Sequence, residues 1–269
     1  MTGAPRPPAR RRLDVALVDK GLAASREKAQ ALIMAGRVRV AGALAHKPGT
    51  AVRSDVVVDV LPGPEHVGRG ALKLAGALDV LALEPAGRIA VDVGASTGGF
   101  TEVLLARGAR RVYAVDVGRA QLHEKLRSDP RVVVLEGVNA RTLSARELPE
   151  ACGFATLDVS FISVLKILPA LRNVLTPDAA LAVLVKPQFE VGRGQVGRGG
   201  IVRDPALHRQ ALEHIARGAQ ALGYGLRGAC ASPIAGVEGN REFFLALAQA
   251  GAPLAPAAFD AMISQALRP

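Results

Sequence analysis

The stretch VDVGASTGGF, from Val91 to Phe100, constrains the fold of this chain more than any other. It starts inside an apolar run at 89–93, breaks into small residues, and passes into apolar residues at helical spacing. A strand that enters a glycine turn and then a helix is how α/β proteins hold a nucleotide-like ligand. Glycine lets the backbone approach the ligand closely, and the free N–H groups at the helix start attract an anion. The stretch therefore predicts a ligand-binding turn.

An acidic residue marks a second part of this ligand site. The segment 111–115 reads as a strand, and Asp116 follows it, 22 residues after Gly94 (116 − 94). A carboxylate at this distance accepts hydrogen bonds from ribose hydroxyls, which indicates an adenosine-bearing cofactor. A turn for a nicotinamide dinucleotide places a second glycine against the pyrophosphate, where this chain has Ser96. S-adenosylmethionine has no pyrophosphate, so the turn favours it, and a dinucleotide stays the alternative.

Charge and composition indicate the class of partner. The net charge of +10 predicts a polyanionic partner, although the high arginine content is also what a GC-rich genome would produce. Residues 1–60 hold 11 Lys and Arg against 5 Asp and Glu, which is +6 of this charge. No apolar run reaches about 18 residues, and no apolar segment follows the N-terminal arginines, so we expect neither a membrane span nor a signal peptide. Cys152 and Cys230 lack metal-ligand spacing, which favours a reduced, cytoplasmic protein without a metal.

Changes of pattern divide the chain into segments. Strands alternate with helices through the larger part, which predicts an α/β fold with a doubly wound, mainly parallel sheet. A helix is expected around 164–174, and His208 and His214 are expected at the surface of a later helix. The predicted segments are a disordered basic tail at 1–10, a small α+β domain at 11–60, a linker at 61–69, the main domain at 70–250, and a C-terminal tail or helix at 251–269.

The small basic segment carries its own motif. It reads as two short helices, the second capped by Ser25, and a strand in which arginines alternate with valines. The run SREKAQALIMAGRVRV resembles the alpha-L RNA-binding domain, a module found in a small-subunit ribosomal protein and in some RNA-modifying enzymes. The resemblance implies that RNA contacts come from Arg26, Lys28, Arg37 and Arg39. The alternative is that these four are ordinary solvated charges.

Four polar motifs carry a wider resemblance. Asp158 and Lys186 each follow a strongly apolar strand, at the edge where parallel sheets place ligands. Lys73 lies on the helix before the first strand of the main domain, and Glu242 stands at the start of the last strand. Taken in order, DVGASTGGF, LDVSFIS, VKPQFE and GNREFF resemble the TlyA-type, hemolysin-like RNA methyltransferases, which belong to the FtsJ-like ribose 2′-O-methyltransferases.

This resemblance implies a fold, a cofactor and a reaction. The fold would be a Rossmann-like methyltransferase domain using S-adenosylmethionine, and the acceptor a cytidine ribose in small-subunit or large-subunit ribosomal RNA. Lys186 would take the proton of the ribose hydroxyl, since neighbouring positive charge and burial lower the pKa of a lysine. The implied catalytic set is Lys73, Asp158, Lys186 and Glu242, with Glu238 as a nearby alternative to Glu242. The implied cofactor contacts are Gly94, Ser96, Gly98, Phe100, Asp116 on the ribose, and Asn139 near the adenine.

Three other functions stay open at this point. The chain could be a non-catalytic RNA-binding or ribosome-assembly factor that keeps the fold. It could damage membranes, as the hemolysin label suggests, although it has no span, no secretion signal and no long amphipathic β-repeat. A nicotinamide-linked enzyme is the third. The methylated nucleotide, the ribosomal subunit and the oligomeric state do not follow from the residues.

Overall fold

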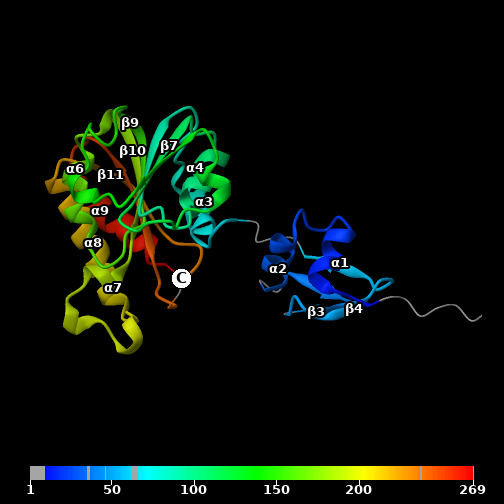
Figure 1. Cartoon of the computed structure of the whole chain (residues 1–269). Coiled ribbons are helices and arrows are strands. Elements are labelled where there is room, and N and C mark those ends of the chain that lie inside the picture. Colours follow the sequence, from blue (N-terminus) through cyan, green and yellow to red (C-terminus); the bar gives the residue numbers. More distant parts are fainter. Residues whose placement is uncertain (1–9, 35–36, 46, 62–65, 237, 269) are drawn as a thin grey trace, which may run out of the picture. The chain divides into compact units, whose positions relative to one another are not determined.

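The computed structural model describes residues 10–34, 37–45, 47–61, 66–236 and 238–268. They fall into two compact units, Met1–Glu65 and His66–Pro269. Figure 1 shows the smaller unit in blue and the larger one in cyan to red. None of the helices in these residues has the length and apolar character that crossing a membrane requires.

The small unit packs two helices on short strands. Its helices are α1 (Leu13–Asp19) and α2 (Arg26–Met34), and Ser25 Oγ accepts a hydrogen bond from the N–H of Lys28, which confirms the expected cap. Leu13, Leu17 and Ile33 are fully buried between the helices and the strands. One antiparallel sheet has the order β3-β2-β5, and a separate pair joins β1 to β4. The strands are β1 (Arg10–Arg12), β2 (Val38–Val40), β3 (Ala43–Ala45), β4 (Ala51–Arg53) and β5 (Val58–Val60).

The N-terminal edge of this unit corrects one prediction. Arg10 pairs with Arg53 in the antiparallel β1–β4 ladder, so it belongs to the folded unit and not to a disordered tail. The rest of that predicted tail lies outside the described residues, as does the part of the predicted linker at 62–65. Three consecutive arginines show no alternation of apolar and polar residues, so the sequence did not predict this strand. It forms because backbone hydrogen bonds, which need no side-chain pattern, join it to β4.

The large unit is built on a seven-stranded sheet of order β11-β12-β10-β9-β6-β7-β8. The ladders from β10 to β8 are parallel, and β12 runs antiparallel to both β10 and β11. The predicted α/β fold with a mainly parallel, doubly wound sheet is confirmed. The strands are β6 (Ile89–Val93), β7 (Arg111–Asp116), β8 (Val132–Glu136), β9 (Cys152–Leu157), β10 (Leu175–Val185), β11 (Gly225–Ala231) and β12 (Phe243–Ala248).

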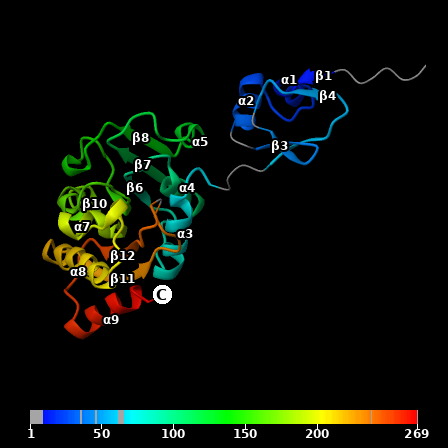
Figure 2. The same ribbon diagram turned by 90° about the horizontal axis from the view of Figure 1, so that it is seen from below.

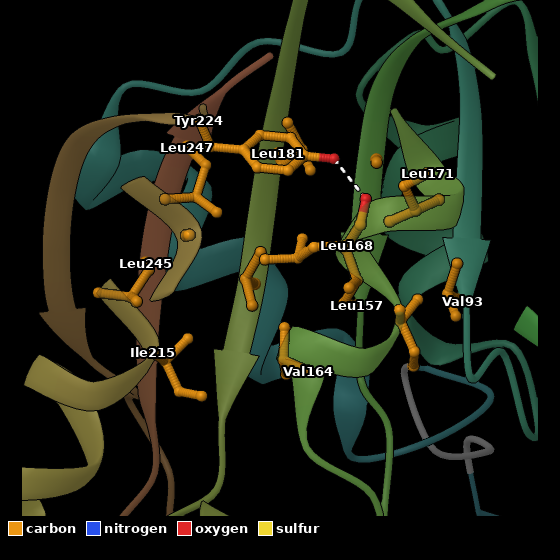
Figure 3. Packing of buried hydrophobic residues seen from close by; sticks show 14 of the residues in the cluster. Val93, Leu157, Val164, Leu168, Leu171, Leu181, Ile215, Tyr224, Leu245 and Leu247 are labelled. Atoms are coloured by element: carbon orange, nitrogen blue, oxygen red, sulfur yellow. Dashed lines mark hydrogen bonds between the residues drawn. The ribbon is translucent and has the colours of Figure 1, made fainter. Parts of the chain in front are cut away.

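Helices cover both faces of this sheet (Figures 1 and 2). Alternate residues of each strand enter two apolar clusters, so that Val91 joins one and Ala90 the other. On the first face Tyr224 donates a hydrogen bond to the carbonyl of Leu168 at 2.8 Å (Figure 3). The helices are α3 (Gly70–Leu81), α4 (Gly99–Ala106), α5 (Glu124–Arg127), α6 (Leu168–Leu171), α7 (Pro187–Glu190), α8 (Pro205–Ala221) and α9 (Pro256–Ala266). The 3₁₀ turns are η1 (Ala140–Thr142), η2 (Val164–Lys166), η3 (Arg193–Gln195) and η4 (Arg198–Gly200).

Three details differ from the sequence predictions. The single helix expected at 164–174 is divided into η2 and α6, and β10 already begins at Leu175. The last segment forms the helix α9, as one of its two predicted forms. Because Phe259 and Ile263 of α9 are buried in the core, however, the large unit extends beyond the predicted end at 250. His208 is 5% exposed and not at the surface, because it lies on the face of α8 that packs inward.

Candidate active site

The ligand turn lies where the order of the sheet reverses, between β6 and β9. Gly94 leaves β6 with a φ of 84°, and a Cβ added there would lie 2.3 Å from the carbonyl oxygen of Asp158, which follows β9. Only glycine fits this approach. Ligands of open α/β sheets bind outside the carboxyl ends of the strands at such a point. The structure therefore brings the predicted turn and Asp158 to one edge.

A cavity of about 630 Å³ opens at this edge. It is lined by Gly94, Ser96, Asp116, Asn139 and Asp158, together with apolar side chains from the neighbouring loops. Asp116 accepts hydrogen bonds from the N–H groups of Ser96 at 2.8 Å and Gly118 at 2.7 Å, so its carboxylate fixes the turn. Each carboxylate oxygen can accept more than one hydrogen bond, so acceptor capacity is left for a ligand.

Two predicted cofactor contacts lie away from this cavity. A Cβ at Gly98, whose φ is 98°, would lie 2.2 Å from Leu126 Cδ1. Phe100 is 3% exposed and stacks on Phe244 with ring centroids 6.0 Å apart. It lines only a small hollow of about 100 Å³ beside the turn. Both residues shape the turn through packing.

The first lysine–carboxylate pair joins distant parts of the chain. Lys73 Nζ, on α3, donates a hydrogen bond to Glu242 Oε2 at 2.6 Å, and the two side chains are 10% and 3% exposed. Glu242 fits closely against Gly236, where an added Cβ would lie 2.5 Å from Glu242 Oε1. Glu238, the alternative acidic residue, is exposed. The structure therefore pairs Lys73 with Glu242.

The second pair joins the ends of β9 and β10. Lys186 Nζ lies 2.6 Å from Asp158 Oδ1 and donates its hydrogen bond to Ser160 Oγ at 3.0 Å. The contact with Asp158 is an attraction between charges without hydrogen-bond alignment, and Asp158 Oδ1 has no hydrogen-bond donor among the described residues. A buried carboxylate oxygen without a donor can accept one from a ligand.

A second cavity, of about 390 Å³, contains both lysines. It is lined by Lys73, Lys186, Glu242 and also Glu238, while Ser160 and Phe161 line both this cavity and the larger one. Phe161 is 91% exposed and has a φ of 65°, which a bulky residue rarely adopts. The site therefore has two compartments that share Ser160 and Phe161. Both lysines line the smaller compartment, and Asp158, the partner of Lys186, lines the larger one.

Known proteins share this architecture. A family model described as FtsJ-like methyltransferase matches residues 66–249, and an S4 domain model matches residues 11–58. The 16S/23S rRNA (cytidine-2′-O)-methyltransferase TlyA of Mycobacterium tuberculosis is 51% identical over 88% of this chain and 89% of its own length. The chain belongs to the TlyA-type FtsJ-like methyltransferases.

Other relatives carry a different name. Hemolysin A of Brachyspira hyodysenteriae is 38% identical to this methyltransferase over 86% of the chain and 97% of its own length. A solved structure from Streptococcus thermophilus, provisionally named a hemolysin, superposes with a TM-score of 0.72 at 40% identity. That match covers 97% of this chain and 96% of the other. The predicted family and the methyltransferase class of enzyme are confirmed.

One residue of the methyltransferase site escaped the sequence reasoning. Asp92, within β6, is completely buried and accepts hydrogen bonds from Thr101 Oγ1 at 2.7 Å and Thr156 Oγ1 at 2.8 Å. Burial raises the pKa of the Asp92 carboxyl to about 6. Thr101 lies at the start of α4 and Thr156 two residues before Asp158, so Asp92 connects the turn to the end of β9 that carries Asp158. The sequence feature that could have indicated Asp92 is that it is the only charged residue within the apolar run IAVDV at 89–93.

The four basic residues expected to contact RNA have different surroundings in the S4 domain. Arg26 donates to the buried Asp14 at 3.0 Å, and Arg37 donates to the carbonyl of Leu61 at 3.0 and 3.2 Å. Lys28 and Arg39 are exposed, and no side-chain hydrogen bond from either of them is found within the described part of the chain. Two of the four therefore also hold the fold.

Proposed function

We propose that this chain is an S-adenosylmethionine-dependent ribosomal RNA (cytidine-2′-O)-methyltransferase that works in the cytoplasm. The observation that carries the proposal is the pairing of Lys73 with Glu242 and Lys186 with Asp158 at two adjoining cavities beside the ligand turn. A non-catalytic RNA-binding protein has no need for two partly buried ion pairs next to a second cavity. The activity named for the Mycobacterium tuberculosis relative supplies the acceptor.

The larger cavity fits S-adenosylmethionine. Its volume of about 630 Å³ lies in the range typical of small-molecule sites. Gly94 and Ser96 would hold the amino-acid end, Asp116 the ribose hydroxyls, and Asn139 would lie near the adenine. Gly98 and Phe100, which the family resemblance assigns to the cofactor, would support the turn through packing. When bound, the cofactor supplies a methyl group that a sulfonium sulfur already activates.

The smaller cavity would hold the acceptor ribose. Its 2′-hydroxyl is a weak nucleophile at neutral pH, so a base must take its proton as the new O–C bond forms. Lys186 Nζ would accept this proton, and Asp158 and Ser160 would orient the amino group. Lys73, held by Glu242, stabilises negative charge that develops on the ribose oxygen. The chain thereby contributes alignment and proton transfer, because the donor needs little activation.

Transfer of tritium from labelled S-adenosylmethionine to ribosomal subunits tests the proposal. The wild-type protein should label ribosomal RNA, and nuclease mapping should place the methyl group on a cytidine 2′-oxygen. Lys186→Ala should reduce transfer by at least about 100-fold, the usual contribution of a general base, and leave cofactor binding in calorimetry unchanged. Lys125→Ala, at a lysine whose side chain is 70% exposed, is the matched control and should stay active.

Two outcomes would reject parts of the proposal. An active Lys186→Ala protein would remove Lys186 as the base. Asp116→Ala with unchanged cofactor binding would reject the assignment of the larger cavity. Wild-type protein that binds ribosomal RNA but transfers no label to free RNA, to either subunit or to assembled ribosomes would favour a non-catalytic assembly factor.

A further inference from the structure

Asn240 is a buried polar residue that the proposed mechanism does not use. It is 1% exposed and lies two residues before Glu242. Its Oδ1 accepts a hydrogen bond from the N–H of Val202 at 2.9 Å, and its Nδ2 donates one to the carbonyl of Gly200 at 2.9 Å. Because one partner is a donor and the other an acceptor, they define the orientation of the amide.

The segment that Asn240 binds forms a wall of the smaller cavity. Val196 and Gly200 line that cavity together with the two lysines. Gly200 has a φ of 77°, and a Cβ added there would lie 3.1 Å from Glu238 Oε2. Residues 192–200, GRGQVGRGG, are mostly glycine and arginine and offer few side chains for packing. Hydrogen bonds must therefore define much of the position of this wall.

Val202 is held from its other side as well. His208 Nε2 lies 2.9 Å from the carbonyl oxygen of Val202, and since a carbonyl only accepts, Nε2 carries the proton. The ring of His208 packs edge-on against Phe243, with centroids 5.5 Å apart. Phe243 directly follows Glu242 in the chain. Both contacts of Val202 thus lead back to residues within two positions of Glu242, namely Asn240 directly and Phe243 through His208.

We propose that Asn240 is a positioning residue for the RNA acceptor. It fixes the Gly200 wall relative to Glu242, so that the acceptor nucleotide meets a cavity of one shape. This role rests on the proposed function, which supplies the nucleotide as ligand. Asn240 contacts neither of the two cavities itself and acts only through Gly200 and Val202. Its loss should therefore weaken the use of RNA without weakening the binding of the cofactor.

Asn240→Asp separates the two hydrogen bonds. The aspartate can still accept from Val202 but cannot donate to Gly200, whose carbonyl it would repel. We expect the KM for ribosomal RNA to rise about tenfold, which corresponds to one lost buried hydrogen bond, with an unchanged Kd for S-adenosylmethionine. The matched control is Asn173→Asp, at an exposed asparagine, and its kinetic constants should equal those of the wild type.

Gly200→Ala tests the same wall without changing Asn240 or adding charge. An alanine with a positive φ is strained, so the wall should move and the KM for RNA should rise in this variant also. If Asn240 only stabilised the fold, both variants would lower the melting temperature and leave the KM for RNA unchanged well below it. That result would overturn the positioning role alone. A wild-type protein that transfers no methyl group would reject the proposed function, and this role with it.

Discussion

Each unit of this methyltransferase buries one aspartate completely, and the two carboxyl groups are shifted in opposite directions. Asp14 in the S4 domain accepts hydrogen bonds from the side chains of Arg12, Arg26 and Gln30 at 2.9–3.0 Å. The hydrogen bonds from Arg12 hold its pKa well below the usual range. The side-chain donors to Asp92 are two threonine hydroxyls and not cations, and burial raises its pKa to about 6.

The difference shows that burial alone does not decide the charge of a carboxyl group. Both side chains are removed from water, but only Asp14 has cationic donors that stabilise its charged form. Those arginines are themselves half exposed, so the S4 domain keeps positive charge at its surface while its buried aspartate stays ionised and ion-paired. The catalytic domain instead places an aspartate that is easily protonated directly behind its ligand turn.

The largest expected effect concerns the pH dependence of the catalytic domain. Because the pKa of Asp92 rises from 3.8 to about 6 on folding, the folded state binds the proton more tightly. The free energy of unfolding should therefore fall as pH rises from about 4 to about 6, by up to roughly 3 kcal/mol. Asp92→Asn should remove this slope. Urea unfolding followed by tyrosine fluorescence measures it, since both tyrosines, Tyr113 and Tyr224, lie in this domain. If the free energy of unfolding depended equally on pH in the wild type and in Asp92→Asn, the raised pKa of Asp92 would be refuted.

The S4 domain should respond in the opposite direction. The charge of Asp14 stabilises the fold above its unfolded pKa, and this stabilisation is lost as pH falls below about 4. Asp14→Asn should destabilise the domain at pH 7 by about 2 kcal/mol, a value limited by the exposure of its arginine partners. Hydrogen exchange of the α1 and α2 amides reports on this domain separately. Asp19→Asn, at an exposed aspartate, should have little effect, and similar losses in both variants would refute the role of Asp14.

A smaller loss of stability is expected when one of the two hydroxyl groups that donate hydrogen bonds to Asp92 is removed. Thr156→Val keeps the side-chain shape but leaves the buried carboxylate with Thr101 alone. The protein should lose about 1 kcal/mol of stability at pH 8, where Asp92 is charged, and less at pH 4, where it is protonated. The same urea titrations at both pH values provide the test. An equal loss at the two values would mean that the hydroxyl contributes through packing only.

The smallest effect on stability should come from the exposed cations of the S4 domain. Lys28→Ala and Arg39→Ala should leave the melting temperature unchanged and each reduce the slope of log K for RNA against log salt by about 1. Arg26→Ala should lower both RNA affinity and stability, because Arg26 also binds Asp14. Filter binding across a salt series, with melting curves of the same proteins, separates the two classes. Unchanged salt slopes for Lys28 and Arg39 would leave them as solvated charges.

The sequence predicted the architecture well where the pattern was local. Alternating strands and helices, and the glycine turn before α4, depend on residues close together in the chain. The strand β1 was missed because its pairing with β4 uses only backbone groups and has no side-chain pattern. The division of the helix expected at 164–174 was missed because its apolar residues suit an uninterrupted helix as well as a 3₁₀ turn followed by a short helix.

In the candidate site, too, local motifs were predictable and contacts between distant residues were not. The residues Lys73, Asp158, Lys186 and Glu242 could be named from motifs, but their pairing could not. Lys73 and Glu242 are 169 positions apart, and only the packing of α3 against β11 and β10 brings their side chains to 2.6 Å. Gly98 and Phe100 belong to the motif of the turn, yet the structure directs them into the core.

By itself the sequence determined the fold class, the place of the ligand turn and the basic character of the N-terminal domain, because these follow from local periodicity, glycine geometry and charge count. The tertiary structure decided which lysine binds which carboxylate, how Ser160 and Phe161 divide the site into two cavities, and how Asn240 holds the wall of one of them. It also decided the opposite behaviour of Asp14 and Asp92. Electrostatic and hydrogen-bond energies depend on the partners that folding brings within about 3 Å, and residues far apart in a chain meet only in the folded state.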